Sequence, residues 1–187
     1  MSAFIIEEWF PPAVPDADLE ALADVIHAVV HAGAGISFIV PFSLDDAKAF
    51  WFHQVLPAVR ARNRRVVIAR TVGDADSGKD GRIVGTVQII LDTPPNQLHR
   101  ADIAKMMVHP DARRLGIARA LMLAIEDIAR AERRTLLTLD TVTGGPAESL
   151  YRSLGYIEVG VIPRYARSSL TPELEGTTIM YKELNPP

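Results

Sequence analysis

The sequence contains no cysteine, few aromatic residues and no excess of positive charge. The absence of cysteine excludes disulfide bonds, thiolate zinc sites and a cysteine nucleophile, and it is compatible with a reducing cytosol. Twenty Lys and Arg stand against 23 Asp and Glu, which gives a formal net charge of −3. No bulk positive field therefore attracts nucleic acid or anionic lipid, and any anion site must be local.

Uninterrupted hydrophobic runs of membrane-spanning character are also scarce. Val25 to Leu44 contains no Asp, Glu, Lys or Arg and is about long enough to cross a bilayer, but His27 and Gly33 interrupt it. A basic leader is not expected, because Glu7 and Glu8 lie close to the start of the sequence. We therefore expect a cytoplasmic protein without a membrane or nucleic-acid partner, and we leave a homodimer open.

The composition that is present favours a well-packed core. Of 187 residues, 48% are hydrophobic, which fits a single domain over residues 1–187 with no linker or repeat. Alternating apolar patterns predict about seven strands, at 4–10, 65–72, 83–92, 102–108, 135–142, 156–162 and 177–184. Helical spacing, an Asp16 N-cap and a Ser43–Asp46 capping box predict four helices, at 16–32, 43–62, 117–133 and 147–154.

The order of these elements predicts an α/β (α+β) fold. The polar segment GDADSGKDGR, at 73–82, suits a hairpin loop, while 102–142 has the strand-turn-helix-strand order of a βαβ unit. The result is one mixed sheet flanked by helices. The segment SSLTPELEG, between the last two strands, is expected to be a loop.

The segment MMVHPDARRLGIARALMLAIEDIA carries the strongest functional signal. A strand ends at Pro110 and Gly116 opens the next helix, so several amides at the helix start lack intrahelical partners. Such a turn suits a phosphate group. Residues 113–134 carry six arginines and three acidic residues, a local charge of +3 within a remainder of −6. The alternative is a plain strand-to-helix turn, whereas a dinucleotide-binding fold fits poorly because G-x-G-x-x-G is absent.

Two motifs resemble those of the Gcn5-related N-acetyltransferase (GNAT) superfamily. V-H-P-x-x-R-x-x-G-I-A-R-A-L, at Val108–Leu121, resembles its acetyl-CoA motif, and A-x-x-L-Y-x-x-L-G-Y, at Ala147–Tyr156, resembles the block that follows. The resemblance covers nearly the whole chain and implies a GNAT-like, mostly antiparallel seven-stranded sheet with about four helices. HAGAGISF near Gly33, LDT at Leu139–Thr141 and V-G-x-I-P-x-Y at Val159–Tyr165 resemble the tabtoxin-resistance acetyltransferase group.

The resemblance implies acetyl-CoA as cosubstrate and a set of residues that bind it. Main-chain groups of three strand residues would pair with the pantetheine arm, namely Met106, Met107 and Val108. Their side chains are expected in the core. The amides of the following turn would hold the pyrophosphate, namely Arg114, Leu115, Gly116, Ile117 and Ala118. Arg113, Arg114 and Arg119 would supply positive charge nearby.

Two residues are candidates for catalysis. Tyr151 lies where the family commonly places a tyrosine that protonates the departing thiolate, which a phenol can do because its pKa exceeds that of a thiol. Asp140 interrupts an apolar strand and could orient water, accept the amine's proton or bind a cationic substrate; otherwise it is a hydrogen-bonded sheet residue. Asp102 and Lys105 stand where many relatives carry a glutamate base, and Gly144 replaces an expected Asn.

The histidines and tryptophans give weaker signals. His27 and His31 have the spacing of a metal pair, but no H-E-x-x-H motif accompanies them, so we expect no metal site. His109 is expected to be exposed in its turn. Trp9 and Trp51 could line an acceptor pocket, although aromatic residues on packing faces usually belong to the core. The same alternatives apply to Phe52.

These features predict an N-acetyltransferase that moves an acetyl group from acetyl-CoA to a small-molecule amine by direct attack in a ternary complex. The acceptor would be an amino-acid-like, toxin or antibiotic amine, which implies a role in detoxification. A non-catalytic CoA-binding or sensing domain is the main alternative. A protein N-terminal or lysine acetyltransferase is a second, and a nucleic-acid-binding module ranks third.

Overall fold

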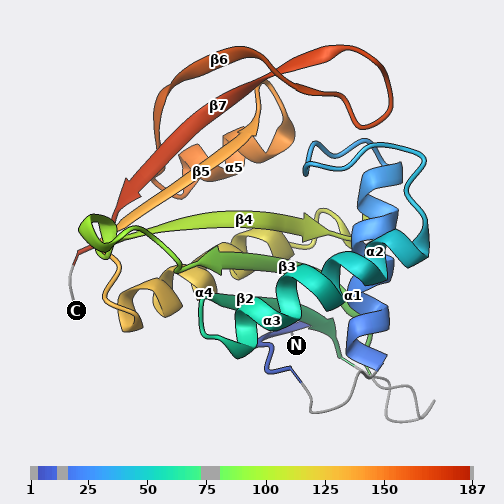
Figure 1. Ribbon diagram of the computed structural model, residues 1–187, viewed down its shortest axis with the longest axis horizontal. Coiled ribbons are helices and arrows are strands. Elements are labelled where there is room, and N and C mark those ends of the chain that lie inside the picture. Colours follow the sequence, from blue (N-terminus) through green and yellow to red (C-terminus); the bar gives the residue numbers. More distant parts are fainter. Residues whose placement is uncertain (1–3, 12–16, 73–80, 186–187) are drawn as a thin grey trace.

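A computed structural model describes residues 4–11, 17–72 and 81–185. Their seven strands form one sheet in the order β1-β2-β3-β4-β5-β7-β6, with helices on both faces (Figure 1). The strands are β1 (Phe4–Glu8), β2 (Arg64–Thr71), β3 (Ile83–Ile90), β4 (Arg100–Val108), β5 (Leu136–Val142), β6 (Ile157–Arg167) and β7 (Leu174–Glu183). The principal helices are α1 (Ala17–His31), α2 (Leu44–Phe50), α3 (Leu56–Arg60), α4 (Ile117–Ala131) and α5 (Pro146–Ser153).

The sheet is antiparallel except where β4 meets β5. These two strands run parallel and pair from Arg100 with Leu136 to Asp102 with Thr138. Their pairing stops there, and the strands separate towards their carboxyl ends (Figure 1). The predicted mixed and mostly antiparallel seven-stranded sheet is confirmed. A gap between neighbouring strands is left in the middle of the sheet.

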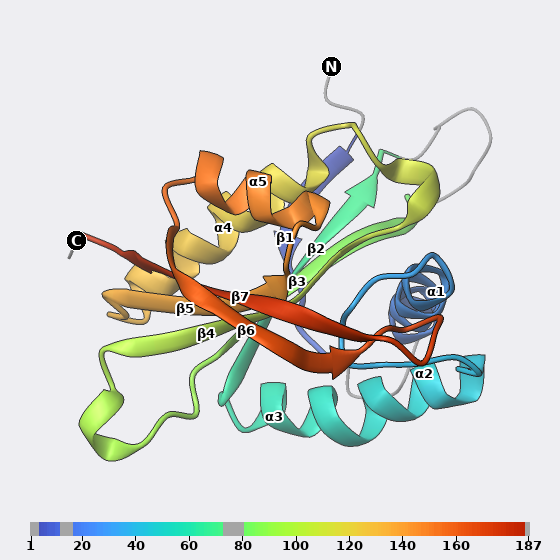
Figure 2. The ribbon, with the colours of Figure 1, turned by 90° about the horizontal axis from the view of Figure 1, so that it is seen from above.

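Helices α4 and α5 cover one face of the sheet (Figure 2). Apolar residues of α4 recur at helical spacing, and Ile117, Leu121 and Ile125 are fully or almost fully buried against the strands. Helix α5 continues this layer and buries Tyr151. Both the acetyl-CoA motif and the following motif therefore lie on the same face.

Helices α1, α2 and α3 cover the opposite face (Figure 2). Ser43 and Asp46 form the predicted capping box at the start of α2. A π-helical segment, Trp51–Val55, lies between α2 and α3 where the sequence predicts one continuous helix. Trp51 packs edge-on to Trp9 and donates its indole N–H to the carbonyl of Leu22 at 3.0 Å. Both tryptophans are core residues.

Two further expectations concern the loop between β6 and β7 and the charge-free run 25–44. The predicted loop between the last two strands is present but shorter than expected, because β6 extends to Arg167 and β7 begins at Leu174, which leaves residues 168–173 as the loop. The charge-free run 25–44 is divided, since α1 stops at His31. No helix among the described ranges is long and apolar enough to cross a membrane. The Asp16 cap and residues 73–80 of the predicted hairpin loop lie outside the described residues.

Lys182 joins β7 to both helices of the motif face. Its ammonium donates to the carboxylate of Glu126 in α4 at 2.6 Å and to the carbonyl of Leu154, just after α5, at 2.7 Å. Glu126 is almost completely buried, so this ion pair neutralises a charge inside the core. The contact fixes the carboxyl end of α5 relative to α4.

Replacing Lys182 tests this connection. We expect Lys182→Met to lower the free energy of unfolding by about 2 to 3 kcal/mol, because a charged hydrogen bond to a buried carboxylate is lost. The matched control is Lys48→Met, which removes a 3.4 Å contact to Glu20 at the exposed surface and should change stability by less than about 1 kcal/mol. Urea denaturation of both variants measures the difference, and equal losses would contradict the assignment.

Candidate active site

A bulge in β4 lies beside the gap in the sheet. The register of β3 and β4 shifts between Thr86 and Gln88, which pair with Met107 and Ala104. Two residues of β4, Lys105 and Met106, therefore oppose one residue of β3, and Lys105 has a left-handed backbone with φ of 51°. Bulges of this kind redirect the strand and its side chains. The edge of β4 next to the gap carries main-chain groups that β5 does not pair.

The methionines of β4 place their side chains in or against the core. The side chain of Met107 is 1% exposed, and Met106 packs partly buried against the core. Their expected core role is confirmed. Val108 ends the strand, one residue before the turn that leads to α4. The main chain of 106–108 therefore runs along the gap towards the start of α4.

The turn before α4 has the geometry of an anion site. Arg114 and Gly116 both have left-handed backbones, with φ of 67° and 82°. The first helical bond joins the N–H of Ala120 to the carbonyl of Gly116, so the amides of Ile117 and Ala118 have no acceptor within the helix. The turn is exposed from residues 113 to 116. Accessible amides and the helix dipole together favour a bound phosphate.

The expectation that His109 is exposed is wrong. His109 is 8% exposed, and its Nδ1 accepts a hydrogen bond from the amide of Asp111 at 3.3 Å. Its Nε2 lies 3.9 Å from Asp24 of α1, and Arg82 approaches the other nitrogen. The ring turns inward because it caps the short turn that begins at Pro110. His109 thus stabilises the start of the turn that joins β4 to α4.

Tyr151 lies on the inner side of α5. Its side chain is buried, and its ring centre is 5.7 Å from that of Tyr156. Burial, and then the negative charge of Asp140, raise the pKa of the Tyr151 phenol well above its usual range. The phenol therefore stays protonated at neutral and moderately alkaline pH. Arg119 of α4 donates to the hydroxyl of Ser153 at 2.6 Å and links this helix to the phosphate turn.

Glu148 is a site-supporting residue that the sequence did not indicate. It accepts hydrogen bonds from the hydroxyl of Thr178 at 2.6 Å and from the amide of Gly144 at 3.1 Å. The Thr178 hydrogen bond is the main reason why the pKa of this carboxyl is lowered. Gly144 has φ of 74°, so the turn before α5 is held by Glu148 where the resemblance suggests an Asn side chain. The E-x-x-Y spacing within the motif was the available signal.

Two carboxylates of the opposite face have different surroundings. Asp102 is held by Arg100 and by the hydroxyl of Thr138. Asp140 is exposed, and its hydrogen-bond partner is the neutral hydroxyl of Thr177, at 3.0 Å. Alternation places it opposite the buried Leu137 and Leu139, as predicted. Within the described part of the chain, no cation forms an ion pair with the Asp140 carboxylate at 4.0 Å or less, although its charge acts on Lys105.

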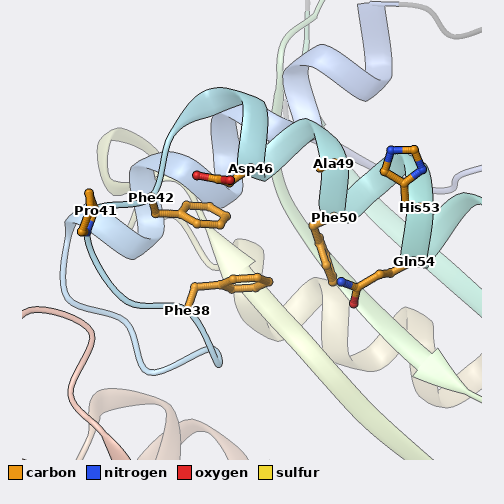
Figure 3. Close-up of a pocket in the computed structure, with 8 residues that line it drawn as sticks. All are labelled: Phe38, Pro41, Phe42, Asp46, Ala49, Phe50, His53 and Gln54. Atoms are coloured by element: carbon orange, nitrogen blue, oxygen red, sulfur yellow. The ribbon is translucent and has the colours of Figure 1, made fainter.

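An aromatic hollow of about 450 Å³ opens beside α2 (Figure 3). The rings of Phe38 and Phe42 are 4.7 Å apart and those of Phe38 and Phe50 are 5.2 Å apart, measured between centres. Figure 3 shows Phe50 and Gln54 pointing from the helix towards Phe38, whereas His53 points away. The sequence singled out Trp9, Trp51 and Phe52 instead. It missed these phenylalanines because Phe38 lies in a turn without a periodic pattern.

The paired histidines of α1 do not form a metal site with other residues. His31 Nδ1 lies 2.9 Å from the carbonyl oxygen of His27, and the two rings lie 4.2 Å apart, centre to centre. Over residues 4–11, 17–72 and 81–185, no group of three or more His, Asp or Glu side chains is placed to hold a metal ion. The i, i+4 spacing is explained here by contacts within one helix face.

The geometry agrees with what comparison with known proteins shows. Residues 42–156 match the model of the acetyltransferase (GNAT) family. An uncharacterized N-acetyltransferase of Azospirillum brasilense, from a hisH-hisA intergenic region, is 30% identical over 125 residues, covering 66% of this chain and 67% of that protein. The chain belongs to the GNAT family. It is an N-acetyltransferase of the acetyl-CoA-dependent class.

Solved GNAT structures share the fold over almost the whole chain. A GCN5-related N-acetyltransferase from Kribbella flavida has a TM-score of 0.72 at 24% identity, covering 97% of this chain and 98% of that one. The yncA acetyltransferase from Salmonella typhimurium, solved with acetyl-CoA, has a TM-score of 0.74 at 17% identity, covering 98% and 95%. The expected GNAT fold is therefore confirmed.

The backbone of the phosphate turn gives a prediction that depends on conformation alone. A Cβ atom added at Gly116 would meet no atom within 4 Å, so Gly116→Ala adds strain only through the left-handed φ. We expect a loss of about 1 to 2 kcal/mol in unfolding free energy. Gly116→Asn is the matched control, because Asn tolerates this conformation. Thermal or urea unfolding distinguishes the two, and equal losses for Ala and Asn would count against the strain argument.

Proposed function

We propose that this GNAT enzyme acetylates a small-molecule amine by direct attack in a ternary complex. The observation that carries the proposal is that Tyr151 buries its phenol on α5 while Asp140 exposes a carboxylate on β5, and the charge of this carboxylate acts on the phenol. Asp140 lies on β5, which together with β4 forms the gap. A proton donor and a proton acceptor are therefore available for the two ends of one transfer reaction.

The cosubstrate would lie along the gap. Main-chain groups of Met106, Met107 and Val108 would pair with the pantetheine arm as an added strand. The amides from Arg114 to Ala118 would hold the pyrophosphate, with Arg113 and Arg119 nearby. Support comes from the unpaired edge of β4 and from the free amides at the start of α4.

The chemical step requires two proton transfers. The neutral amine nitrogen attacks the thioester carbonyl carbon, while the amide of Val108 donates a hydrogen bond to the carbonyl oxygen. Asp140 accepts the proton released by the nitrogen, directly or through one water. The carbon–sulfur bond breaks, and Tyr151 gives its proton to the sulfur. The products are the N-acetyl amine and CoA, and exchange with solvent restores both side chains.

The acceptor is proposed to be an amino-acid-like, toxin or antibiotic amine. The narrower resemblance to tabtoxin-resistance acetyltransferases includes the segment HAGAGISF, whose last three residues contact Lys105. This contact connects the loop that would border the acceptor to the bulge of β4. Acetylation of the amine would remove its positive charge and its nucleophilicity, which suits detoxification.

A screen of acetyl-CoA turnover against amines tests the function. The panel contains amino acids, polyamines, aminoglycosides and peptides with a free N-terminus, and release of the CoA thiol is measured. We expect turnover with small amines and a strong loss of kcat/KM in Asp140→Asn with unchanged CoA affinity. CoA binding without thiol release for any amine would favour a sensor, and turnover of peptides alone would favour a protein acetyltransferase.

Tyr151→Phe tests the proton donor. We expect kcat to fall about a hundredfold or more, because general acid catalysis is lost, while the Kd for CoA stays near the wild-type value. Tyr156→Phe is the matched control, since its phenol is also buried but lies beside Glu126 and not beside Asp140. It should leave kcat near the wild-type value. Unchanged turnover in Tyr151→Phe would remove Tyr151 from the mechanism.

A further inference from the structure

Arg64 is a partly buried cation without a carboxylate partner. Its Nη1 donates to the side-chain oxygen of Gln88 at 2.8 Å, and its Nε is buried with no partner. Among the described residues, no carboxylate lies within 4.0 Å of its guanidinium, and burial lowers its pKa. The other two arginines of β2 differ, because Arg65 and Arg70 are each bound by two carboxylates.

Lys105 is a second cation of this kind. From the β4 bulge its ammonium donates to the carbonyl of Ile36 at 2.8 Å and to the hydroxyl of Ser37 at 3.0 Å. It also lies 5.4 Å from the ring centre of Phe38, which lines the aromatic hollow. In the parts of the chain that are described, its nitrogen has no carboxylate within ion-pair distance. An ammonium has three donors, so one remains.

The two cations influence each other and lie on the same face. Burial lowers the pKa of Lys105, the charge of Asp140 raises it and that of Arg64 lowers it. Gln88 contacts Arg64 and pairs with Ala104, the residue before Lys105. Gln88 is fully buried, yet its side-chain nitrogen has no partner within the described residues. Unused donors therefore gather beside the bulge.

A charge of the opposite sign lies on the same side of the sheet as this group. Cross-strand pairing places Arg64 in line with Ile90 and Asp102 on the side of the sheet that α1 and α3 cover, and Asp140 follows on the same side two residues after Thr138. Its carboxylate has the Thr177 hydroxyl as a neutral partner. Among the described residues, neither cation has a carboxylate within 4.0 Å and Asp140 has no cation within that distance, although the charge of Asp140 acts on Lys105.

We propose that the acceptor is a zwitterion whose carboxylate binds Arg64 and Lys105 while its amine faces Asp140. This inference rests on the proposed function and specifies its substrate class. Buried charges are unfavourable unless they are paired, so the carboxylate of a ligand would supply the negative counter-charge that Arg64 and Lys105 need. A guanidinium and an ammonium also match a carboxylate by geometry and charge. The carboxamide of the same amino acid has no negative charge and therefore binds less tightly.

Matched pairs of substrates test the proposal. Each protein L-amino acid is compared with its amide, with acetyl-CoA saturating, and kcat/KM is measured by release of the CoA thiol. We expect the best amino acid to exceed its amide about ten- to hundredfold, the factor for a lost charged hydrogen bond. The preference should reside in KM, because the carboxylate contacts bind the acceptor and do not touch the thioester.

Variants assign the preference to Arg64. Arg64→Gln should raise KM for the amino acid about ten- to hundredfold and leave KM for the amide unchanged. Arg64→Lys keeps the charge and should retain most of the preference, which guards against an effect of misfolding. Arg62→Gln removes the same charge at an exposed position of the turn before β2 and should change neither KM. Circular dichroism confirms that all three variants are folded.

The outcomes separate this inference from the proposed function. The carboxylate site is overturned if amides have the same kcat/KM as the amino acids, or if Arg64→Gln raises KM equally for both. Acetyl transfer itself would be unaffected by either result. If no amine is acetylated, calorimetry of the same amino acids with the CoA-bound protein decides. Binding that Arg64→Gln abolishes would keep the carboxylate site and reject the transfer function, whereas absence of binding rejects both.

Discussion

The separation of β4 from β5 is the constraint on which the site depends. The strands pair through Asp102 and Thr138 and then part, and the bulge at Lys105 turns the free edge of β4 towards the gap. The bulge is held from outside the sheet, because the Lys105 ammonium is bonded to the segment between α1 and α2. One side chain thus connects the free edge of β4 with the segment between α1 and α2.

Each side of the gap is then fixed by a separate set of contacts. On the motif face, Arg119 joins α4 to α5, while Lys182 holds the end of α5 and the buried Glu126. Glu148 fixes the turn that precedes Tyr151. These contacts position the phosphate turn and the phenol as one unit. On the other face the aromatic residues around Phe38 pack together, and Phe38 both contacts Lys105 and lines the hollow beside α2.

The sequence predicted what local patterns encode. The spacing of apolar residues predicted α4, and Gly116 predicted the turn that precedes it. The spacing of Ser43 and Asp46 predicted the capping box at the start of α2. Features that depend on distant residues were not predicted. The bulge at Lys105 arises from pairing with β3, and His109 is buried because α1 packs beside it. Both require contacts between segments far apart in the chain, which no local pattern contains.

The distribution of charge in the candidate active site was also not predictable from local sequence patterns, because it depends on contacts between distant residues. The excess of arginine over residues 113–134 does not by itself locate an anion site, because Arg130 is paired with Glu126 and Asp127 and Arg134 is bound by main-chain carbonyls. Arg64, outside that window, is the guanidinium of β2 that has no carboxylate partner among the residues that the structure describes. What a ligand encounters is therefore set by which charges the fold leaves unpaired, and a net charge of −3 is compatible with an acceptor site that binds a carboxylate.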